Sequence, residues 1–405
     1  MKQKKLMLLG GIRYLLPVIE AAHKLGAYVI TADYLPDNIA HKYSDEYVNV
    51  SIIDKDAVLR VAQEKRIDGI LSFGVDPGVV TAAYVAEKMG LPSPPLKSVE
   101  ILQNKDKFRD FLEANGFNCP WHKGYLSKDE ALHDFSANPE WFPVIVKPVD
   151  SAGSKGCSRV ASFRDLAGAV DIAITASHSK KYIVEQYLDG IQMGSDCFVL
   201  NNKLVYCTFG KQVFDVAAVN QLAPIANIWP ADIPLVKQCE LESEIQRLVK
   251  LLDLKTSILN IETRIAKDGR AYIMEVSPRG GGNRIAEVLS YATGQDLILA
   301  DVLFALGHSE SIKLDKPIYK DVWAYYILHS DFSGIYAGAA EIEHGFKRRH
   351  VIDFDDWCSK GQKISAFTGA NQALGTLILR FDSFQEADMA LRSAKEWLDM
   401  NILKI

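Results

Sequence analysis

The stretch "SILNIETRIAKDGRAYIMEVS" constrains the fold more than any other part of the chain. Apolar residues recur along it on both sides of Asp268-Gly269, and Asp-Gly between two such runs is the strongest short signal for a β-hairpin. A two-residue turn would pair Lys267 with Arg270 and would fix the register of everything further out. The sequence therefore predicts two adjacent antiparallel strands with a defined pairing.

Two acidic residues face each other in this predicted hairpin. Counting outward from the turn pairs Glu262 with Glu275, and Asn260 and Ser277 follow on the same face. Directly opposed residues have Cβ atoms about 4.5–5.5 Å apart, so the like charges need compensation. A hard cation such as Mg²⁺ with oxygen ligands would provide it, as would a shared proton. In an arbitrary hairpin, two glutamates on a solvated face are the commoner explanation.

The chain that follows the hairpin favours a binding site. Arg279 and Arg284 bracket the sequence "GGGN", and Asn283 is expected to cap the next helix. Arginine side chains and helix N-termini both attract phosphate oxygens. A metal ion, an arginine and a phosphate group are thus predicted to converge at one point.

The first hundred residues alternate short apolar strands with amphipathic helices, which predicts a parallel, doubly wound sheet. Ligands bind at the C-terminal strand ends of such sheets, which here are marked by Gly10-Gly11, Asp33 and Asp76. The turn "GGIRYL" lacks the G-x-G-x-x-G spacing of a dinucleotide site, so a dinucleotide is not the favoured ligand.

A lysine and a glycine loop lie in the middle of the chain. Lys147 interrupts the apolar strand "FPVIVKP", where it can contact phosphate or extend its ammonium group to solvent. The next residues, "DSAGSKG", can turn backbone N–H groups toward phosphates because Gly153 and Gly156 permit close approach. The loop differs from the usual P-loop, and a short glycine loop is more often only a turn.

The strand "YIVEQYL" carries a second unexpected charge. Glu185 could accept a hydrogen bond from an adenine amino group, and the backbone at Tyr187 or Leu188 could meet the ring edge. The alternative is an ordinary edge strand with Glu185 directed outward.

Composition excludes several classes of protein. The 405 residues predict two or three domains at roughly 150 residues each. The net charge of −5 gives no sign of a nucleic-acid or membrane partner, because such partners usually require a strong basic excess. The six cysteines have no C-x-x-C or zinc-like spacing, which is typical of reduced thiols and predicts a cytoplasmic protein.

In their order and spacing, these stretches resemble the ATP-grasp superfamily and its carboxylate–amine ligases. The motifs are "NKDKF", "FPVIVKP" with its glycine loop, "YIVEQYLDG", "NIE" and "IMEVSPRGGG". The resemblance implies a mixed α/β and α+β architecture. A Rossmann-like pre-ATP-grasp domain would span 1–100, an ATP-grasp domain of two α+β subdomains 101–308 with a small lid at about 118–187, and an α+β segment 309–405.

The resemblance also implies roles for individual residues, with ATP and Mg²⁺ (or Mn²⁺) as cofactors. The nucleotide would be bound by Lys105, Lys147, Ser151, Gly153, Ser154, Gly156, Glu185, Gln186, Tyr187 and Leu188. The metal ligands would be Glu262, Glu275 and Ser277, and the groups acting on the transferred phosphate Arg279, Lys147 and Arg284.

The implied reaction joins a small carboxylate to an amine, with release of ADP and phosphate. Within the superfamily, the chain looks most like the L-amino-acid ligase branch, whereas carbamoyl-phosphate synthase-like, biotin carboxylase-like and phosphoribosylglycinamide synthetase-like enzymes share the same nucleotide motifs. A non-catalytic ATP-binding module is the alternative of another class. It is suggested by Ser277, where the family commonly has asparagine, and by Gln192, where it usually has glutamate. Paired subunits are common among such enzymes.

Overall fold

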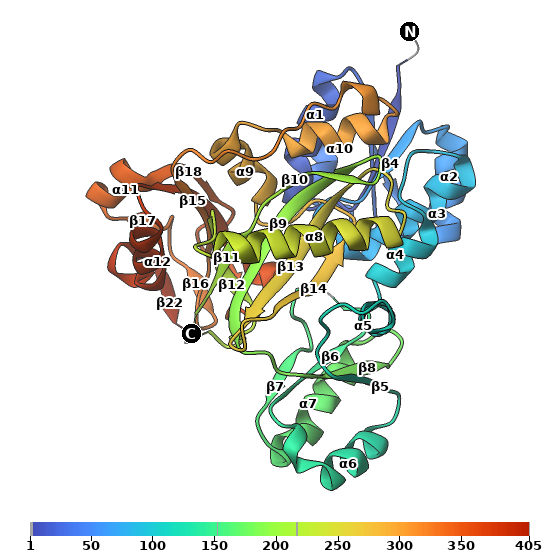
Figure 1. Cartoon of the computed structure of the whole chain (residues 1–405). Coiled ribbons are helices and arrows are strands. Elements are labelled where there is room, and N and C mark those ends of the chain that lie inside the picture. Colours follow the sequence, from blue (N-terminus) through green and yellow to red (C-terminus); the bar gives the residue numbers. More distant parts are fainter. Residues whose placement is uncertain (1–2, 152, 216–217, 405) are drawn as a thin grey trace.

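The computed structural model describes residues 3–151, 153–215 and 218–404 (Figure 1). Its N-terminal part is a parallel sheet of order β3-β2-β1-β4. The strands are β1 (Lys5–Leu9), β2 (Tyr28–Asp33), β3 (Glu46–Asn49) and β4 (Gly69–Leu71), and the helices are α1 (Leu16–Lys24), α2 (Lys55–Lys65) and α3 (Val79–Met89). Leu6 and Leu8 pack with α1, whereas Met7 and Leu9 pack with α2 and α3. The predicted doubly wound sheet is confirmed.

Two short helices, α4 (Leu96–Leu102) and α5 (Lys105–Ala114), lead into a small antiparallel sheet at the bottom of Figure 1. This sheet has order β5-β8-β6-β7 and comprises β5 (His122–Tyr125), β6 (Val144–Pro148), β7 (Ser158–Val160) and β8 (Tyr182–Gln186). Helices α6 (Lys128–Ala137) and α7 (Phe163–Ala176) cover one face. Val144 and Val146 point into that core, so the alternation of β6 places Ile145 and Lys147 on the opposite face.

The largest sheet runs in the order β14-β13-β9-β11-β12-β15-β20-β18, with β10 paired to β9. Its strands are β9 (Gly190–Leu200), β10 (Lys203–Cys207), β11 (Gly210–Phe214), β12 (Pro224–Trp229), β13 (Ser257–Ala266), β14 (Ala271–Ser277), β15 (Val322–Leu328), β18 (Val351–Asp356) and β20 (Gly375–Phe381). Since β15, β18 and β20 come from the last hundred residues, the C-terminal segment extends this sheet.

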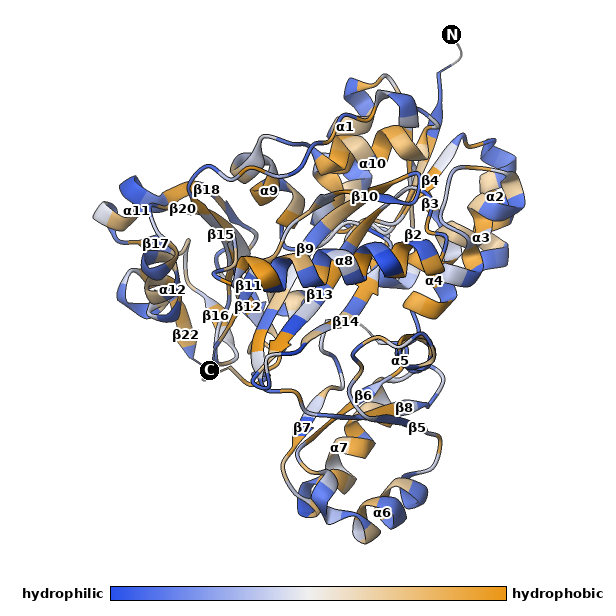
Figure 2. Ribbon diagram, viewed as in Figure 1, coloured by the Kyte–Doolittle hydropathy of each residue, from blue (hydrophilic) through white to orange (hydrophobic). Residues whose placement is uncertain are grey.

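Helices cover both faces of the largest sheet. One face packs against α8 (Leu235–Leu251), and the other packs against α9 (Ile285–Thr293) and α10 (Leu297–Ala305). Helix α10, orange in Figure 1, contacts β4 of the N-terminal sheet and β13 of the largest sheet, whereas α9 contacts β9 and β15. Figure 2 shows hydrophobic residues, coloured orange on the ribbon, along the elements where these layers meet. One continuous core therefore holds the N-terminal part against the rest.

The C-terminal segment contributes further short elements. They are β16 (Gly334–Tyr336), β17 (Glu341–Ile342), α11 (His344–His350), β19 (Lys363–Ile364), α12 (Phe384–Arg392), β21 (Leu398–Asp399) and β22 (Ile402–Lys404). Two of them, α11 and α12, contact strands of the largest sheet. Within the described residues, no single helix is long and apolar enough to cross a membrane. Helices α9 and α10 together pass that test by length and composition only, and they are bent by 117° at their junction.

The β13–β14 hairpin differs from its prediction in two places. Ile265 pairs with Ala271 rather than with Tyr272, because the turn is a three-residue loop in which Gly269 has φ +80°. A bulge at Met274 then shifts the register back by one residue. The predicted two-residue turn is wrong, but the two departures cancel on the way to the strand ends.

Candidate active site

A cavity of about 290 Å³ lies where all parts of the molecule meet. The N-terminal part, the small sheet, the hairpin and β15 each contribute to its walls, including Asp76, Lys147, Glu185, Glu262, Glu275 and Tyr325. Most of the residues singled out in the sequence are therefore brought together, although they range from Asp76 to Asn283 along the chain.

The acidic pair lies on the wall formed by the largest sheet. Glu262 and Glu275 are Cα partners, as the sequence predicted, and both line the cavity. Burial, together with the facing Glu275 carboxylate, raises the pKa of Glu262 to about 6. The Gln212 side chain bonds to Glu262, and Gln212 Oε1 is buried without a hydrogen-bond partner among the described residues. Two carboxylates beside a buried amide oxygen form a donor set that fits Mg²⁺.

The opposite wall carries Lys147 and Glu185, and a second cation, the buried Arg109, lies behind them and shares the Glu185 carboxylate. Lys147 Nζ lies 2.8 Å from Glu185 Oε2, and Arg109 Nε lies 3.0 Å from Glu185 Oε1. Burial alone would raise the pKa of Glu185, but Arg109 and Lys147 hold it at about 2. Burial lowers the pKa of Lys147; Glu185 opposes this effect and Arg109 adds to it. The fully charged cluster has one excess positive charge, which favours an anionic ligand.

Several groups that were predicted to contact adenine form hydrogen bonds or ion pairs within the protein. Both oxygens of Glu185 face cations of the cluster, so its contact with an adenine amino group stays a prediction. The amide of Gln186 donates to the Trp121 carbonyl at 2.8 Å, and that of Tyr187 donates to the Pro143 carbonyl at 3.0 Å. The Tyr187 N–H is therefore committed to the strand network rather than to the cavity.

Lys105 connects the acidic wall to the glycine loop. Its Nζ lies 3.3 Å from Glu275 Oε1 and donates to the Ser151 carbonyl at 2.7 Å. Burial would lower the pKa of Lys105, but Glu275 and other nearby groups raise it overall. The lysine thus stays charged and fixes the start of the loop next to the carboxylate pair.

The glycine loop itself packs against a distant segment. Gly153 and Gly156 have φ +65° and +74°, a conformation that favours glycine. Ser154 Oγ donates to the Leu222 carbonyl at 3.1 Å, which places the loop over the cavity. Ala152 belongs to the predicted loop but lies outside the described residues.

Arg279 is held by a residue from the N-terminal part. Its Nε and one terminal nitrogen donate to the two Asp76 oxygens at 2.9 and 2.7 Å. Burial opposes ionisation of Asp76, yet Arg279 keeps the pKa of that carboxyl below its usual range. Such a two-bond pair fixes the plane of the guanidinium group. The C-terminal end of β4, which the sequence marked as a ligand position, therefore orients an arginine.

Ser277 takes part in the same network. Its hydroxyl donates to Asp76 Oδ1 at 3.0 Å and accepts from Gln103 Nε2 at 2.8 Å. The hydroxyl is thus hydrogen-bonded in both directions. Its role as a metal ligand stays a prediction, whereas the contact with Asp76 is a structural one.

Two predictions concern the chain after the glycines. Arg284 is not among the residues that line the cavity, and its side chain forms ion pairs with Glu287 and Asp353. These contacts do not support its predicted catalytic role, which stays a prediction. Asn283 does not cap the next helix either, because Arg284 occupies the position before α9. The Asn283 side chain instead accepts a hydrogen bond from Tyr14 Oη at 2.6 Å.

Sequence reasoning missed two residues of the site. Arg109 lies in "DKFRDFLEANG", which reads as an ordinary amphipathic helix, yet the side chain is 1% exposed. Arg109 and Leu112 are three residues apart, so both lie on the buried side of the helix. This spacing was the signal in the sequence that could have identified Arg109. Gln212 lies in a short strand, and nothing in its neighbourhood marks it.

Comparison with known proteins agrees with this geometry. Residues 140–287 match the family model of the ATP-grasp domain, a range that contains the glycine loop, Lys147 and the carboxylate pair. Over this range, the chain matches the ATP-grasp domain.

Particular relatives match parts of the chain. Formate-dependent phosphoribosylglycinamide formyltransferase of Prochlorococcus marinus is 31% identical over 188 residues, which are 46% of this chain and 48% of the relative. The large chain of carbamoyl phosphate synthase from Thermotoga petrophila is 26% identical over 273 residues, which are 66% of this chain and 24% of the relative. The chain thus spans half or less of these curated relatives.

Solved structures cover the whole chain. L-amino acid ligase from Bacillus licheniformis aligns over 100% of both chains with a TM-score of 0.81 and 21% identity. Phosphoribosylglycinamide synthetase from Anaerococcus prevotii also aligns over 100% of both chains, with a TM-score of 0.74 and 18% identity. At these identities the likeness establishes the shared fold.

Proposed function

We propose that this chain is an ATP-dependent ligase, which activates a small carboxylate as an acyl phosphate and joins it to an amine. The observation that supports this most directly is the pairing of a cationic wall with an acidic wall across one cavity of an ATP-grasp domain. Phosphate groups and a metal ion can be bound together between walls of opposite charge.

In this proposal, Lys147 and Lys105 bind phosphate oxygens of ATP, and the loop from Ser151 to Gly156 covers them. Glu262 and Glu275 hold Mg²⁺, or Mn²⁺ in its place. The metal ion, when bound, neutralises charge on the phosphates. The ion pair between Lys105 and Glu275 supports this proposal, because the proposed phosphate ligand then lies beside the proposed metal ligands.

The two chemical steps need positioning rather than a protein nucleophile. In the first step, a carboxylate oxygen attacks the terminal phosphorus of ATP and ADP leaves, which gives an acyl phosphate. In the second step, the amine nitrogen attacks the acyl carbon, phosphate leaves, and the nitrogen loses a proton. Arg279, oriented by Asp76 at the cavity wall, is suited to bind the phosphoryl group during both steps.

The substrate class rests on the relatives. The relatives include an L-amino acid ligase, a formate-dependent formyltransferase and a carbamoyl phosphate synthase, so the proposed substrates are a small carboxylate and an amine. A solved neighbour, the biotin carboxylase domain from Hydrogenobacter thermophilus, is described as a dimer, and we expect this chain to pair as well. The six described cysteines are free, consistent with the proposed cytoplasmic location.

The test is phosphate release from Mg²⁺-ATP across a matrix of small carboxylates and amines, with bicarbonate included. We expect release that depends on one carboxylate together with one amine. Glu275→Ala serves as the inactive reference, and Glu64→Ala, at an exposed position on α2, serves as the matched control with unchanged turnover.

The outcomes separate the alternatives. Release with bicarbonate alone would identify a carboxyphosphate-forming enzyme instead. Tight ATP binding without release in any combination would favour a non-catalytic nucleotide-binding module. Full activity of Glu275→Ala would contradict the metal-site assignment.

A further inference from the structure

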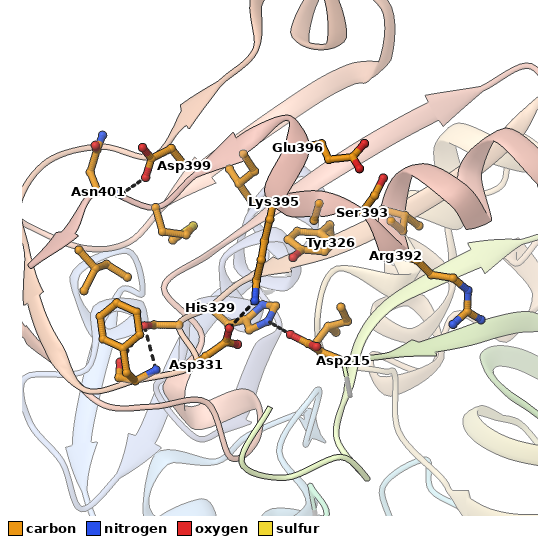
Figure 3. A pocket seen from close by; sticks show the side chains of 18 of the residues that line it. Asp215, Tyr326, His329, Asp331, Arg392, Ser393, Lys395, Glu396, Asp399 and Asn401 are labelled. Carbon is orange, nitrogen blue, oxygen red and sulfur yellow. Dashed lines mark hydrogen bonds and ion pairs between the residues drawn. The ribbon is translucent and has the colours of Figure 1, made fainter. Parts of the chain in front are cut away.

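A second cavity, of about 800 Å³, lies between the inner strands β11, β12 and β15 of the largest sheet and the C-terminal elements (Figure 3). Among the described residues it shares no lining residue with the candidate active site. The alternation of β15 explains the separation, because Tyr325 and Ile327 face the active-site cavity whereas Tyr326 faces the second one. The second cavity is therefore open to a ligand of its own.

Three side chains that are able to bind a metal ion converge in this cavity. Asp215 follows β11, and His329 and Asp331 follow β15. One ligand atom from each lies within 4.8 Å of the other two. Figure 3 shows the His329 ring between the two carboxylates, and a dashed line joins Lys395 to Asp331. A buried imidazole and two carboxylates thus form a compact group at one end of the cavity.

The hydrogen bonding of His329 directs one ring nitrogen into this group. The side chain is only 5% exposed, and Nδ1 lies 2.8 Å from the Ile327 carbonyl oxygen. A carbonyl can only accept, so Nδ1 carries the hydrogen and Nε2 can present a lone pair. Fixing the imidazole through its other nitrogen in this way is the usual arrangement for a metal-binding histidine.

The spacing between the ligand atoms fits an ion between them. His329 Nε2 lies 3.5 Å from Asp215 Oδ2. That separation exceeds the usual 2.7–2.9 Å, roughly, of a charge-assisted hydrogen bond. Two ligands at about 2.1 Å from a tetrahedral metal ion stand roughly 3.4 Å apart. The observed separation therefore matches two ligands of one ion better than a direct contact.

Asp331 provides a second, independent observation that points to a cation ligand. Its Oδ1 is buried and has no hydrogen-bond partner among the described residues. Its Oδ2 lies 2.6 Å from Lys395 Nζ, but the Lys395 side chain is 75% exposed. An exposed lysine is held weakly by such a pair, because side-chain entropy and solvent oppose the contact. Lys395 thus occupies the cluster as a displaceable monovalent cation.

We propose that Asp215, His329 and Asp331 bind a divalent transition-metal ion of the Zn²⁺ type. The imidazole ligand favours such an ion over Mg²⁺, which prefers oxygen ligands. Three protein ligands leave a fourth coordination position open, and here it would face the second cavity. The site is separate from the proposed ligase chemistry and does not depend on it.

The test is Co²⁺ binding to the full chain in the absence of ATP, followed by visible absorption and by calorimetry. The Glu262→Ala/Glu275→Ala variant serves as the background, because it removes the acidic pair of the active site. We expect one Co²⁺ per chain in this background. His329→Gln should weaken binding by at least about tenfold. Lys395→Met should tighten binding, because it removes the competing cation.

Two controls keep the result interpretable. His329 packs on Tyr326 and Phe367, so Asp331→Asn, which preserves side-chain volume, is the second ligand variant. Thermal unfolding shows that each variant is folded. Loss of Co²⁺ binding in a folded Asp331→Asn variant supports the site. Equal Co²⁺ binding in the background and in both ligand variants, or no binding in the background at all, would overturn it.

Discussion

The two walls of the active-site cavity carry opposite charges and are stabilised in different ways. On the cationic wall, Glu185 pairs with both Lys147 and Arg109, so each buried charge has a partner. On the acidic wall, Glu262 faces Glu275, and of these only Glu275 has an ion-pair partner, Lys105, within the described residues. The first wall is complete in the free protein, whereas the second retains a repulsion that a metal ion removes.

The strongest test of this difference is Glu275→Gln. On the proposed function, turnover falls by about 10³-fold, or roughly 4 kcal/mol of activation free energy, because the metal ion loses a charged ligand. The thermal stability of the metal-free protein should change little, since relief of the repulsion with Glu262 offsets the loss of the ion pair with Lys105. Steady-state kinetics and a melting curve give both values, and a strongly destabilised variant would contradict the account.

Glu185→Ala should have the opposite effect on stability. It leaves Lys147 and Arg109 buried without their shared carboxylate, and the free energy of unfolding should fall by about 3–5 kcal/mol. Denaturant unfolding measures the loss, with Glu275→Ala as the matched removal of a glutamate from the other wall. Equal stability of the two variants would show that the walls do not differ in this way.

Two arginines near the glycine run sharpen the comparison further. Arg279→Lys keeps the charge but loses the two-bond contact with Asp76, so the proposed turnover should fall by about 10²-fold. Arg284→Lys should change kcat by less than about threefold, because Arg284 contacts Glu287 and Asp353 outside the cavity. Comparable losses of kcat in both variants would support the predicted catalytic role of Arg284.

The smallest expected effect is a pH dependence of stability. Burial and the facing carboxylate raise the pKa of Glu262 from 4.5 to about 6, so the folded state holds this proton more tightly than the unfolded state does. Protonated Glu262 therefore adds up to about 2 kcal/mol to the free energy of unfolding below about pH 4.5, and this contribution is lost as the pH rises through 6. Urea unfolding gives the free energies of unfolding of the wild type and Glu262→Gln between pH 4.5 and 7. As the pH rises, the variant should become more stable relative to the wild type. A stability difference that does not depend on pH would contradict the raised pKa of Glu262.

The position of the acidic pair was predictable because it depends on local patterns. Alternation and the Asp-Gly turn placed Glu262 opposite Glu275, and the structure confirms this pairing. The agreement depends on the Met274 bulge, which compensates for the longer turn. No rule of strand alternation predicts such a bulge, so the inner pairs of the hairpin were misassigned while the outer ones were right.

Contacts between distant segments were not predictable in the same way. Arg279 and Asp76 are 203 residues apart, and Arg109 and Glu185 are 76 apart. Their pairing depends on how the N-terminal sheet, α5 and the small sheet pack, which no local motif encodes. The sequence therefore indicated which charged residues matter, but it did not show which of them neutralise one another.

The most direct test of the two-wall account is calorimetric ATP binding with and without Mg²⁺. For the wild type, we expect Mg²⁺ to tighten ATP binding, because the ion links the phosphates to the acidic wall. For Glu262→Gln/Glu275→Gln, ATP should still bind to the cationic wall, but with an affinity that no longer depends on Mg²⁺. An equal Mg²⁺ effect in the wild type and the double variant would show that these glutamates do not hold the metal ion.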